Sequence, residues 1–265
     1  YTLSLHDALP ILMAEHKTNC FKCIKNGACE LQAMAREYGI DVPNFKSSHG
    51  DVQHEPFNAH PFLSYDPGLC IQCQRCISTC AKATGRHALS LERNGARVYV
   101  KVPFGEGWEN SLCESCGNCA QACPTGALTI KRRKDYREWE VKKVRTACPH
   151  CATGCQMDLY VKDGKIVDVQ GADGPSNHNL LCVKGRSGSF DFVDCDARIR
   201  YPLIKNKETG EFERATWDEA LNLVASKFSE IRNQYGGEAL AGYACSRYNN
   251  EDIYMHQKMV RTAYK

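Results

Sequence analysis

The sequence contains no run of about 20 apolar residues, the length that a helix needs to cross a bilayer, so we predict no transmembrane segment. Charge of neither sign is in excess, because 34 Lys and Arg face 31 Asp and Glu and give a formal net charge of +3. Nucleic-acid-binding domains usually carry a strong basic excess, so we expect no nucleic-acid partner. Apolar residues are not scarce: 43% of the 265 residues are hydrophobic, which excludes wholesale disorder.

Cysteine is the residue in excess, because 17 thiols in a chain of 265 residues require either a disulfide scaffold or metal sites. Disulfide frameworks usually join cysteines far apart in the chain, whereas these come in tight C-x-x-C groups that converge several sulfurs on one point. The spacing therefore favours metal clusters. Such clusters imply a reducing compartment, so we predict a cytoplasmic location.

An internal repeat with an offset of 43 residues organises the middle of the chain. Its two runs share the spacing C-x2-C-x2-C-x3-C, and in two-cluster ferredoxins the fourth cysteine of each run ligates the other cluster. We therefore predict two 4Fe-4S sites, one held by Cys70, Cys73, Cys76 and Cys123, the other by Cys113, Cys116, Cys119 and Cys80. Zinc is the alternative, but it normally needs only C-x-x-C pairs and would leave the third cysteine of each run unexplained.

Two further ligand sets flank the repeat and bring the predicted number of 4Fe-4S clusters to four. The first consists of His16, Cys20, Cys23 and Cys29, and the last of Cys148, Cys151, Cys155 and Cys182. Taken alone, either set could also hold zinc. A neutral imidazole in place of a thiolate raises the potential in Rieske centres, so by analogy the first cluster could be an electron sink or exit. The remaining Cys195 and Cys245 are interpreted as ordinary buried thiols.

These patterns predict a multi-domain α+β chain. Its segments are residues 1–11, interpreted as a sequencing artefact similar to a translated library adapter and set aside from the fold; 12–40, an iron–sulfur module with one histidine and three cysteine ligands; 41–66, a loop-rich linker; 67–134, a two-cluster ferredoxin-type domain; 144–200, a β-rich 4Fe-4S domain; and 201–265, the truncated start of an α/β domain. The basic run 131–134 is interpreted as a solvated face.

Local signals place several elements. A helix is predicted over residues 30–38, ended by Gly39, and the apolar stretches 88–91 and 127–130 are predicted to pair as strands. Asp163-Gly164 suits a tight turn, so residues 157–162 and 165–169 should form a hairpin. Thr216 and Glu219 have capping-box spacing for a helix that ends at Gly236. A strand over 239–244 and a helix from about Asn250 complete the pattern.

Several motifs follow one another in an order that resembles the catalytic large subunit of cytoplasmic formate dehydrogenases, in the molybdopterin oxidoreductase superfamily. They are HKTNCFKCIKNGACELQ (16–32), CIQCQRCISTC, CESCGNCAQACPTGAL, CPHCATGCQ followed by LCVKGR, and WDEAL with SRYNNED. The resemblance implies formate oxidation to CO2, or its reverse, at molybdenum or tungsten held by a bis-molybdopterin guanine dinucleotide. It also implies flavin/NAD(P)-binding or ferredoxin-type partner subunits, and a molybdopterin-binding role for residues 201–265.

The resemblance carries roles to a few residues. Lys184 would lie between the last cluster and the pterin and help to conduct electrons, although a surface lysine is the alternative. Pterin contacts would fall on Ser246, Arg247 and Asn250, in a stretch that departs from the commoner pattern at Tyr248. The family's catalytic Cys or selenocysteine would lie beyond Lys265, and a 2Fe-2S domain often precedes the first module, so we expect no catalytic residue in this fragment.

Three alternatives stay open. The large peripheral subunit of NADH-quinone oxidoreductase resembles the first and last modules but usually lacks a complete second run such as 113–123. A stand-alone polyferredoxin carrier would not need the C-terminal α/β elements. A structural zinc protein would contain zinc in place of the roughly 16 iron atoms that four 4Fe-4S clusters require.

Overall fold

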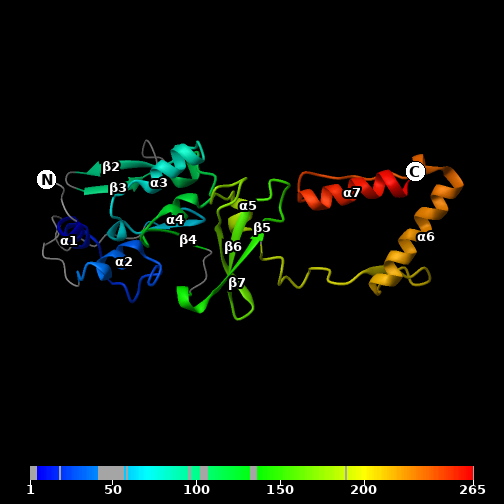
Figure 1. The fold of residues 1–265 in the computed structure, drawn as a ribbon, viewed down its shortest axis with the longest axis horizontal. Helices are drawn as coiled ribbons and strands as arrows, with labels where there is room; N and C mark the ends of the chain where they lie inside the picture. The colour runs from blue at the N-terminus through cyan, green and yellow to red at the C-terminus, as the bar shows by residue number, and fades with distance from the viewer. Residues whose placement is uncertain are drawn as a thin grey trace. The chain divides into compact units, whose positions relative to one another are not determined.

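The computed structural model describes residues 5–17, 19–40, 57, 59–94, 97–101, 107–131, 136–188 and 190–264 (Figure 1). It divides into two compact units. Unit 1 comprises residues 1–147 and 155–188, and unit 2 comprises residues 148–154 and 189–265. Helices and short antiparallel strands alternate along the described residues, which confirms the α+β class.

The N-terminal module of unit 1 consists of α1 (Leu5–Glu15), α2 (Glu30–Glu37) and the turn-rich segment between them. Leu9 and Met13 of α1 are buried against Leu31 and Ala35 of α2. The predicted second helix and its end are confirmed, because Tyr38 caps α2 and Gly39 follows with a φ of +65°. Setting residues 1–11 aside from the fold was wrong for residues 5–11, which form the first turns of α1.

The ferredoxin-like part of unit 1 is built on two short antiparallel sheets. β1 (Leu63–Tyr65) pairs with β4 (Leu128–Ile130), and β2 (Ser90–Asn94) pairs with β3 (Arg97–Lys101). The prediction that residues 88–91 pair with 127–130 was therefore wrong. Leu63 and Tyr65 point inward on the same face as Leu128 and Ile130, so β1 completes the apolar core better than a pairing of the two repeat strands would.

β1 lies at the end of the segment predicted to be a linker. Of that segment, residues 41–56 and 58 lie outside the described residues, as do residues 132–134 of the basic run. The two cysteine runs lead into short helices, α3 (Arg75–Ser78), which continues as a π-helical turn over Thr79–Ala83, and α4 (Asn118–Ala122). These helices and the two sheets surround one core that includes Leu89, Trp108 and Ala120.

A three-stranded antiparallel sheet completes unit 1. Its strands are β5 (Lys142–Ala147), β6 (Gln156–Lys162) and β7 (Lys165–Gly171), in that order across the sheet. The predicted hairpin is confirmed: Asp163 and Gly164 join β6 to β7 with φ values of +50° and +74°, as a type I′ turn requires. β5 was not predicted, because its mostly exposed residues give no apolar alternation.

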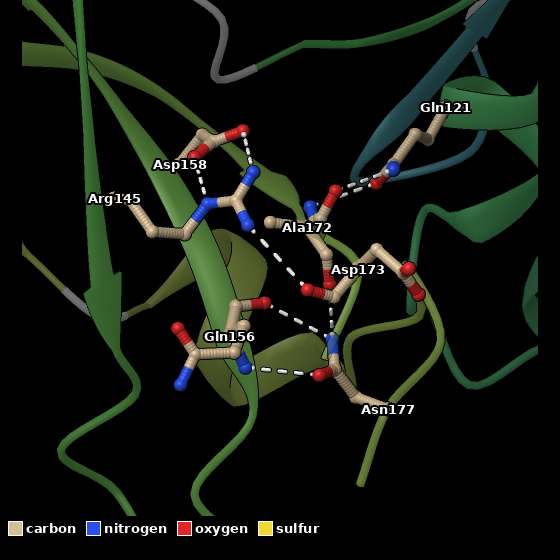
Figure 2. A network of polar contacts seen from close by, with 8 residues as sticks. Gln121, Arg145, Gln156, Asp158, Ala172, Asp173 and Asn177 are labelled. Atoms are coloured by element: carbon tan, nitrogen blue, oxygen red, sulfur yellow. Dashed lines mark hydrogen bonds and ion pairs between the residues drawn. The ribbon is translucent and has the colours of Figure 1, made fainter. Parts of the chain in front are cut away.

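The segment after β7 turns back toward α5 (Val183–Ser187) and is held by one buried side chain (Figure 2). Asn177 donates from Nδ2 to the carbonyls of Gln156, Ala172 and Leu180 and accepts at Oδ1 from the Gln156 amide. This clamp fixes the path of residues 172–181, which lead directly to Cys182.

Unit 2 contains the hairpin β8 (Leu203–Lys205) and β9 (Phe212–Arg214), followed by α6 (Trp217–Tyr235) and α7 (Asn250–Ala263). The predicted capping box is confirmed, with Thr216 Oγ1 accepting from the Glu219 amide. The strand predicted over residues 239–244 was wrong. In the described residues of unit 2, β8 and β9 pair only with each other, so no sheet edge receives that segment.

Among the residues described, none of the helices combines the length and the apolar character needed to span a bilayer.

Candidate metal centres

A cavity of about 360 Å3 in unit 1 is lined by cysteines from both runs of the repeat. The run that precedes and opens α3 contributes three sulfurs, and the end of α4 contributes the fourth. The four cysteines are Cys70, Cys73, Cys76 and Cys123. Tyr65, Val100 and Leu128 form an apolar wall of the same cavity.

A second cavity, of about 380 Å3, has the reciprocal composition. Its cysteines are Cys113, Cys116 and Cys119 from the second run and Cys80 from the first. The nearly equal volumes are what a repeated structure should produce. Each cavity thus gathers three cysteines of one run and the fourth of the other. In the described part of the chain, no group of three or more His, Cys, Asp or Glu side chains is arranged so that it could hold a single metal ion.

The two runs share an uncommon backbone conformation. Gln72 and Ser115, which are equivalent in the repeat, have φ values of +56° and +57°. Their amides donate to the sulfurs of Cys70 and Cys113, each over 3.4 Å. Positive φ is unfavourable for residues other than glycine and is tolerated where the surrounding structure imposes it. Both loops therefore hold a strained geometry that directs N–H groups at cysteine sulfur.

Burial controls the state of these thiols. It raises the pKa of Cys70 and Cys113, raises that of Cys76 to about 12, and raises that of Cys119 well above its usual value; nearby thiols add to the effect in each case. As free side chains they are therefore protonated at neutral pH. A thiolate in such a site needs a strong positive charge beside it, which metal coordination supplies. The donor set thus fits iron–sulfur clusters.

Tyr65 of β1 adds a side-chain hydrogen bond to the first cavity. Its ring is 3% exposed, its hydroxyl accepts from the Val100 amide over 3.0 Å, and it donates to the sulfur of Cys70. Burial first, and the neighbouring thiol second, raise the pKa of Tyr65, so the hydroxyl keeps its proton and acts as a donor.

The N-terminal module brings three of its four predicted ligands together. Burial raises the pKa of Cys29, and the nearby Cys20 and Cys23 raise it further. His16 is held differently: the carbonyl of Leu69 accepts a hydrogen bond from its ring, while Nδ1 is buried without a hydrogen-bond partner. Burial lowers the pKa of His16, so the imidazole is neutral and Nδ1 keeps a lone pair that a metal could accept. The described contacts of His16 do not include the cysteines.

This module packs directly against the first cavity. A Cβ placed on Gly126 would lie only 2.8 Å from the sulfur of Cys23 and 3.5 Å from Leu69, so only glycine permits this approach. The Glu30 amide donates to the carbonyl of Pro124, which lines the first cavity. The predicted His16 set and the predicted Cys70 set are therefore neighbours across residues 124–126.

At the other side of the repeat, the second cavity contacts the segment that carries Cys182. Asn118 Nδ2 donates to the carbonyl of Leu181 over 2.9 Å and to the sulfur of Cys116 over 3.4 Å, and Asn118 Oδ1 accepts from the Leu181 amide. Leu181 is bonded to Cys182. The side chain of Asn118 thus connects a cysteine of the second cavity to the backbone of a predicted ligand of the fourth set.

Arg186 of α5 stabilises the same junction. It is 5% exposed, and its guanidinium donates to the Cys116 carbonyl over 2.8 Å and to side-chain oxygens of Asn118, Gln121 and Gln170. Burial lowers the pKa of Arg186, against which nearby Asp168 and several thiols favour the charged form. A guanidinium remains protonated even so, which places a buried positive charge beside the second cavity.

The fourth predicted set is divided between the units, with Cys148 and Cys151 in unit 2 and Cys155 and Cys182 in unit 1, so its convergence stays a prediction. Lys184 is exposed on α5, and Ser246, Arg247 and Asn250 are exposed at the start of α7 and before it. Cys195 and Cys245, predicted to be buried, are exposed, because unit 2 buries few side chains; all 17 cysteines are free.

Sequence reasoning missed three polar residues that serve these centres. Asn118 and Arg186 lie within recognised motifs but have no spacing signal of their own. His60 lies in the segment predicted to be a linker, and the structure buries it with Nε2 3.4 Å from the sulfur of Cys113. Its only signal in the sequence was a histidine three residues before an apolar strand.

Comparison with known families gives four matches along the chain. The NADH-ubiquinone oxidoreductase-G iron-sulfur binding region matches residues 6–43, and the ferredoxin-like domain of NADH-quinone oxidoreductase subunit 3 matches 61–129. The molybdopterin oxidoreductase Fe4S4 domain matches 141–191, and the molybdopterin oxidoreductase family matches 198–265.

Similar proteins carry several names. The NADH-quinone oxidoreductase G subunit 2 of Rhizobium meliloti is 33% identical over 97% of this chain and 29% of its own length. The protein named "Putative formate dehydrogenase SH0748" of Staphylococcus haemolyticus is 30% identical over 98% and 30%, and NADPH-Fe(3+) oxidoreductase subunit alpha of Geobacter sulfurreducens is 30% identical over 96% and 29%. The chain therefore spans about 30% of these relatives. A crystal structure of NAD+-reducing [NiFe]-hydrogenase covers 46% of this chain and 52% of its own, at 31% identity and a TM-score of 0.42.

Proposed function

We propose that this chain, which belongs to the molybdopterin oxidoreductase superfamily, is the iron–sulfur portion of a formate dehydrogenase that relays electrons between a pterin site and partner subunits. The observation that supports it best is the pair of four-cysteine cavities, each built from both runs of the repeat. A bound 4Fe-4S cluster exchanges single electrons at a potential set by its burial and by hydrogen bonds to its sulfurs. The chain would supply both.

The ligands of the proposed clusters follow from the donor sets. Cys70, Cys73, Cys76 and Cys123 would hold one cluster; Cys113, Cys116, Cys119 and Cys80 a second; His16, Cys20, Cys23 and Cys29 a third; and Cys148, Cys151, Cys155 and Cys182 a fourth. The amides of Gln72, Ser115 and Ala88 donate to sulfurs of Cys70, Cys113 and Cys80, where they would stabilise negative charge.

The contacts within unit 1 support an order for these sets. Asn118 connects Cys182 to the Cys113 set, and Gly126 brings the Cys70 set beside Cys23. The proposed order is therefore the Cys148 set, the Cys113 set, the Cys70 set and the His16 set. Lys184 would lie at the pterin end, with Ser246, Arg247 and Asn250 as pterin contacts. Flavin/NAD(P)-binding or ferredoxin-type subunits would exchange electrons at the His16 end, in the cytoplasm.

Paired ligand substitutions test the assignment of cysteines to clusters. In the anaerobically purified full-length parent protein, Cys70→Ser and Cys123→Ser should remove the same electron paramagnetic resonance signal, and Cys113→Ser and Cys80→Ser should remove a different one. Cys195→Ser, an exposed cysteine outside every set, should leave all signals unchanged. If Cys123→Ser instead matches Cys113→Ser, each run keeps its own cluster and the proposal of exchanged ligands is wrong.

Formate as the substrate rests on the resemblance and on relatives that carry that name. The large peripheral subunit of NADH-quinone oxidoreductase is the second candidate, favoured by two family matches and by the Rhizobium relative. Adding formate to the oxidised full-length protein should reduce its clusters under the first proposal and leave them oxidised under the second. A colourless preparation that contains zinc in place of about 16 iron atoms would contradict both.

A further inference from the structure

His60 has a hydrogen-bonding environment that fixes which of its ring nitrogens carries the proton. Its side chain is 2% exposed. The backbone amides of Phe62 and Leu63 both donate to Nδ1, each over 3.0 Å. A nitrogen that accepts two N–H groups cannot bear a hydrogen of its own, and a neutral imidazole carries one N–H. The proton therefore lies on Nε2.

Nε2 of His60 faces the sulfur of Cys113 at 3.4 Å. Since Nε2 bears the hydrogen, the contact is an N–H group that donates to sulfur. The ring cannot easily turn away, because Trp108 packs edge-to-face against it with ring centroids 5.3 Å apart and an interplanar angle of 89°. The amide of Ser115 donates to the same sulfur. Cys113 is thus the sulfur of the second cavity that receives both a backbone and a histidine donor.

We propose that His60 is a positioning residue that raises the reduction potential of the cluster held by Cys113, Cys116, Cys119 and Cys80. The inference rests on the proposed iron–sulfur function. Reduction adds negative charge to a cluster and its sulfurs, so an N–H donor stabilises the reduced form more than the oxidised form. The first cavity has no histidine at this place, since its side-chain donor is the hydroxyl of Tyr65. The two clusters would therefore differ in potential although their cysteine ligands are equivalent.

The test is a redox titration of the cluster-loaded full-length protein, followed by electron paramagnetic resonance. The signal of interest is the one that Cys113→Ser removes. His60→Met retains a weak acceptor for the two amides but has no donor. It should weaken reduction of that cluster about tenfold, a shift of about 59 mV to lower potential for a one-electron couple. His60→Gln has both an acceptor and a donor and should restore most of the potential.

Two controls separate tuning from packing. Trp108→Phe alters the packing around His60 but not the donor, and should leave the potential in place. Tyr65→Phe should shift the signal that Cys70→Ser removes and not the one that Cys113→Ser removes. An unshifted potential in His60→Met, or equal shifts in the Met and Gln variants, would overturn the inference. If the wild-type protein holds no iron, the proposed function itself fails.

A measurement on the unsubstituted protein covers the case in which His60→Met loses the cluster. With 15N-labelled histidine, pulsed electron paramagnetic resonance of the reduced protein should detect a 15N coupling on the signal that Cys113→Ser removes. The coupling should disappear in His60→Gln, because glutamine is unlabelled. Absence of this coupling in the wild-type protein would also refute the role of His60.

Discussion

Replacing Asn177 by aspartate tests whether one buried amide holds the segment that leads to Cys182. The substitution changes a single NH2 group to oxygen and keeps the Oδ1 acceptor for the Gln156 amide. It removes the donor to the carbonyls of Gln156, Ala172 and Leu180, at 3.0, 3.0 and 2.9 Å, and turns an oxygen toward all three (Figure 2). Because Asn177 is 7% exposed, water cannot easily replace the lost bonds.

The size of the effect follows from the two hydrogens of the amide. Losing two hydrogen bonds at about 1 kcal/mol each, and leaving at least one buried carbonyl unpaired at about 1–3 kcal/mol, gives roughly 3–5 kcal/mol. This cost should appear as local opening, so amide hydrogen exchange at Leu180, whose amide donates to the carbonyl of residue 177, should be faster by about a hundredfold to a thousandfold. Exchange in α6 of unit 2 should not change.

Asn179→Asp is the matched control, because it makes the same chemical change two residues away on an exposed side chain. Asn179 has a φ of +65°, which aspartate also tolerates, so its effect should stay within about 0.5 kcal/mol. If the exchange rate at Leu180 is the same in the two variants, the clamp does not stabilise this segment and the reasoning from its hydrogen bonds is refuted.

Two more predictions follow. Gly126→Ala should displace the sulfur of Cys23 and lower the iron content by about four atoms per chain, as measured by metal analysis; Gly188→Ala, which meets no atom closer than 3.9 Å, should retain all iron. Thr216→Ala should destabilise the first turn of α6 by about 1 kcal/mol, measured by amide exchange. In the wild type, hydrogen bonds from Thr216 lower the pKa of Glu219, so the contribution of this carboxylate is present above the ordinary Glu pKa and disappears as the pH falls through the lowered value, which an NMR titration can follow. An unshifted Glu219 titration would contradict the capping box.

The sequence predicted elements whose signals are local. The hairpin at Asp163-Gly164 and the cap at Thr216 depend on a few neighbouring residues, and both were confirmed. Strand pairing depends on partners far along the chain. Residues 128–130 form a strand within the expected stretch, but its partner β1 follows a proline-rich segment that conceals it. The strand expected over 239–244 failed for the same reason, since no partner strand lies beside it in the described residues of unit 2.

The candidate sites show the same division. Grouped cysteines could be assigned to sets because their spacing is fixed by how one loop surrounds a cluster. The residues around the sulfurs follow no spacing rule: His60 reaches Cys113 across 53 positions, and Arg186 reaches the carbonyl of Cys116 across 70. Such contacts exist only once the chain has folded. Sequence reasoning can therefore predict which metal a set suits, but not the groups that adjust its potential.

The exchange of fourth cysteines between the runs determines the order of the proposed relay. Cys123 lines the cavity of Cys70, and the residues directly after Cys123 meet the N-terminal module at Cys23. Cys116 lines the other cavity and is connected through Asn118 to the segment of Cys182. If each run kept its own fourth cysteine, Cys123 and Cys116 would belong to one set, and both neighbouring modules would contact that set alone. The Cys70 set would then lie off the route. Because the ligands are exchanged, each set faces one neighbour, and all four can take part in a single sequence of transfers.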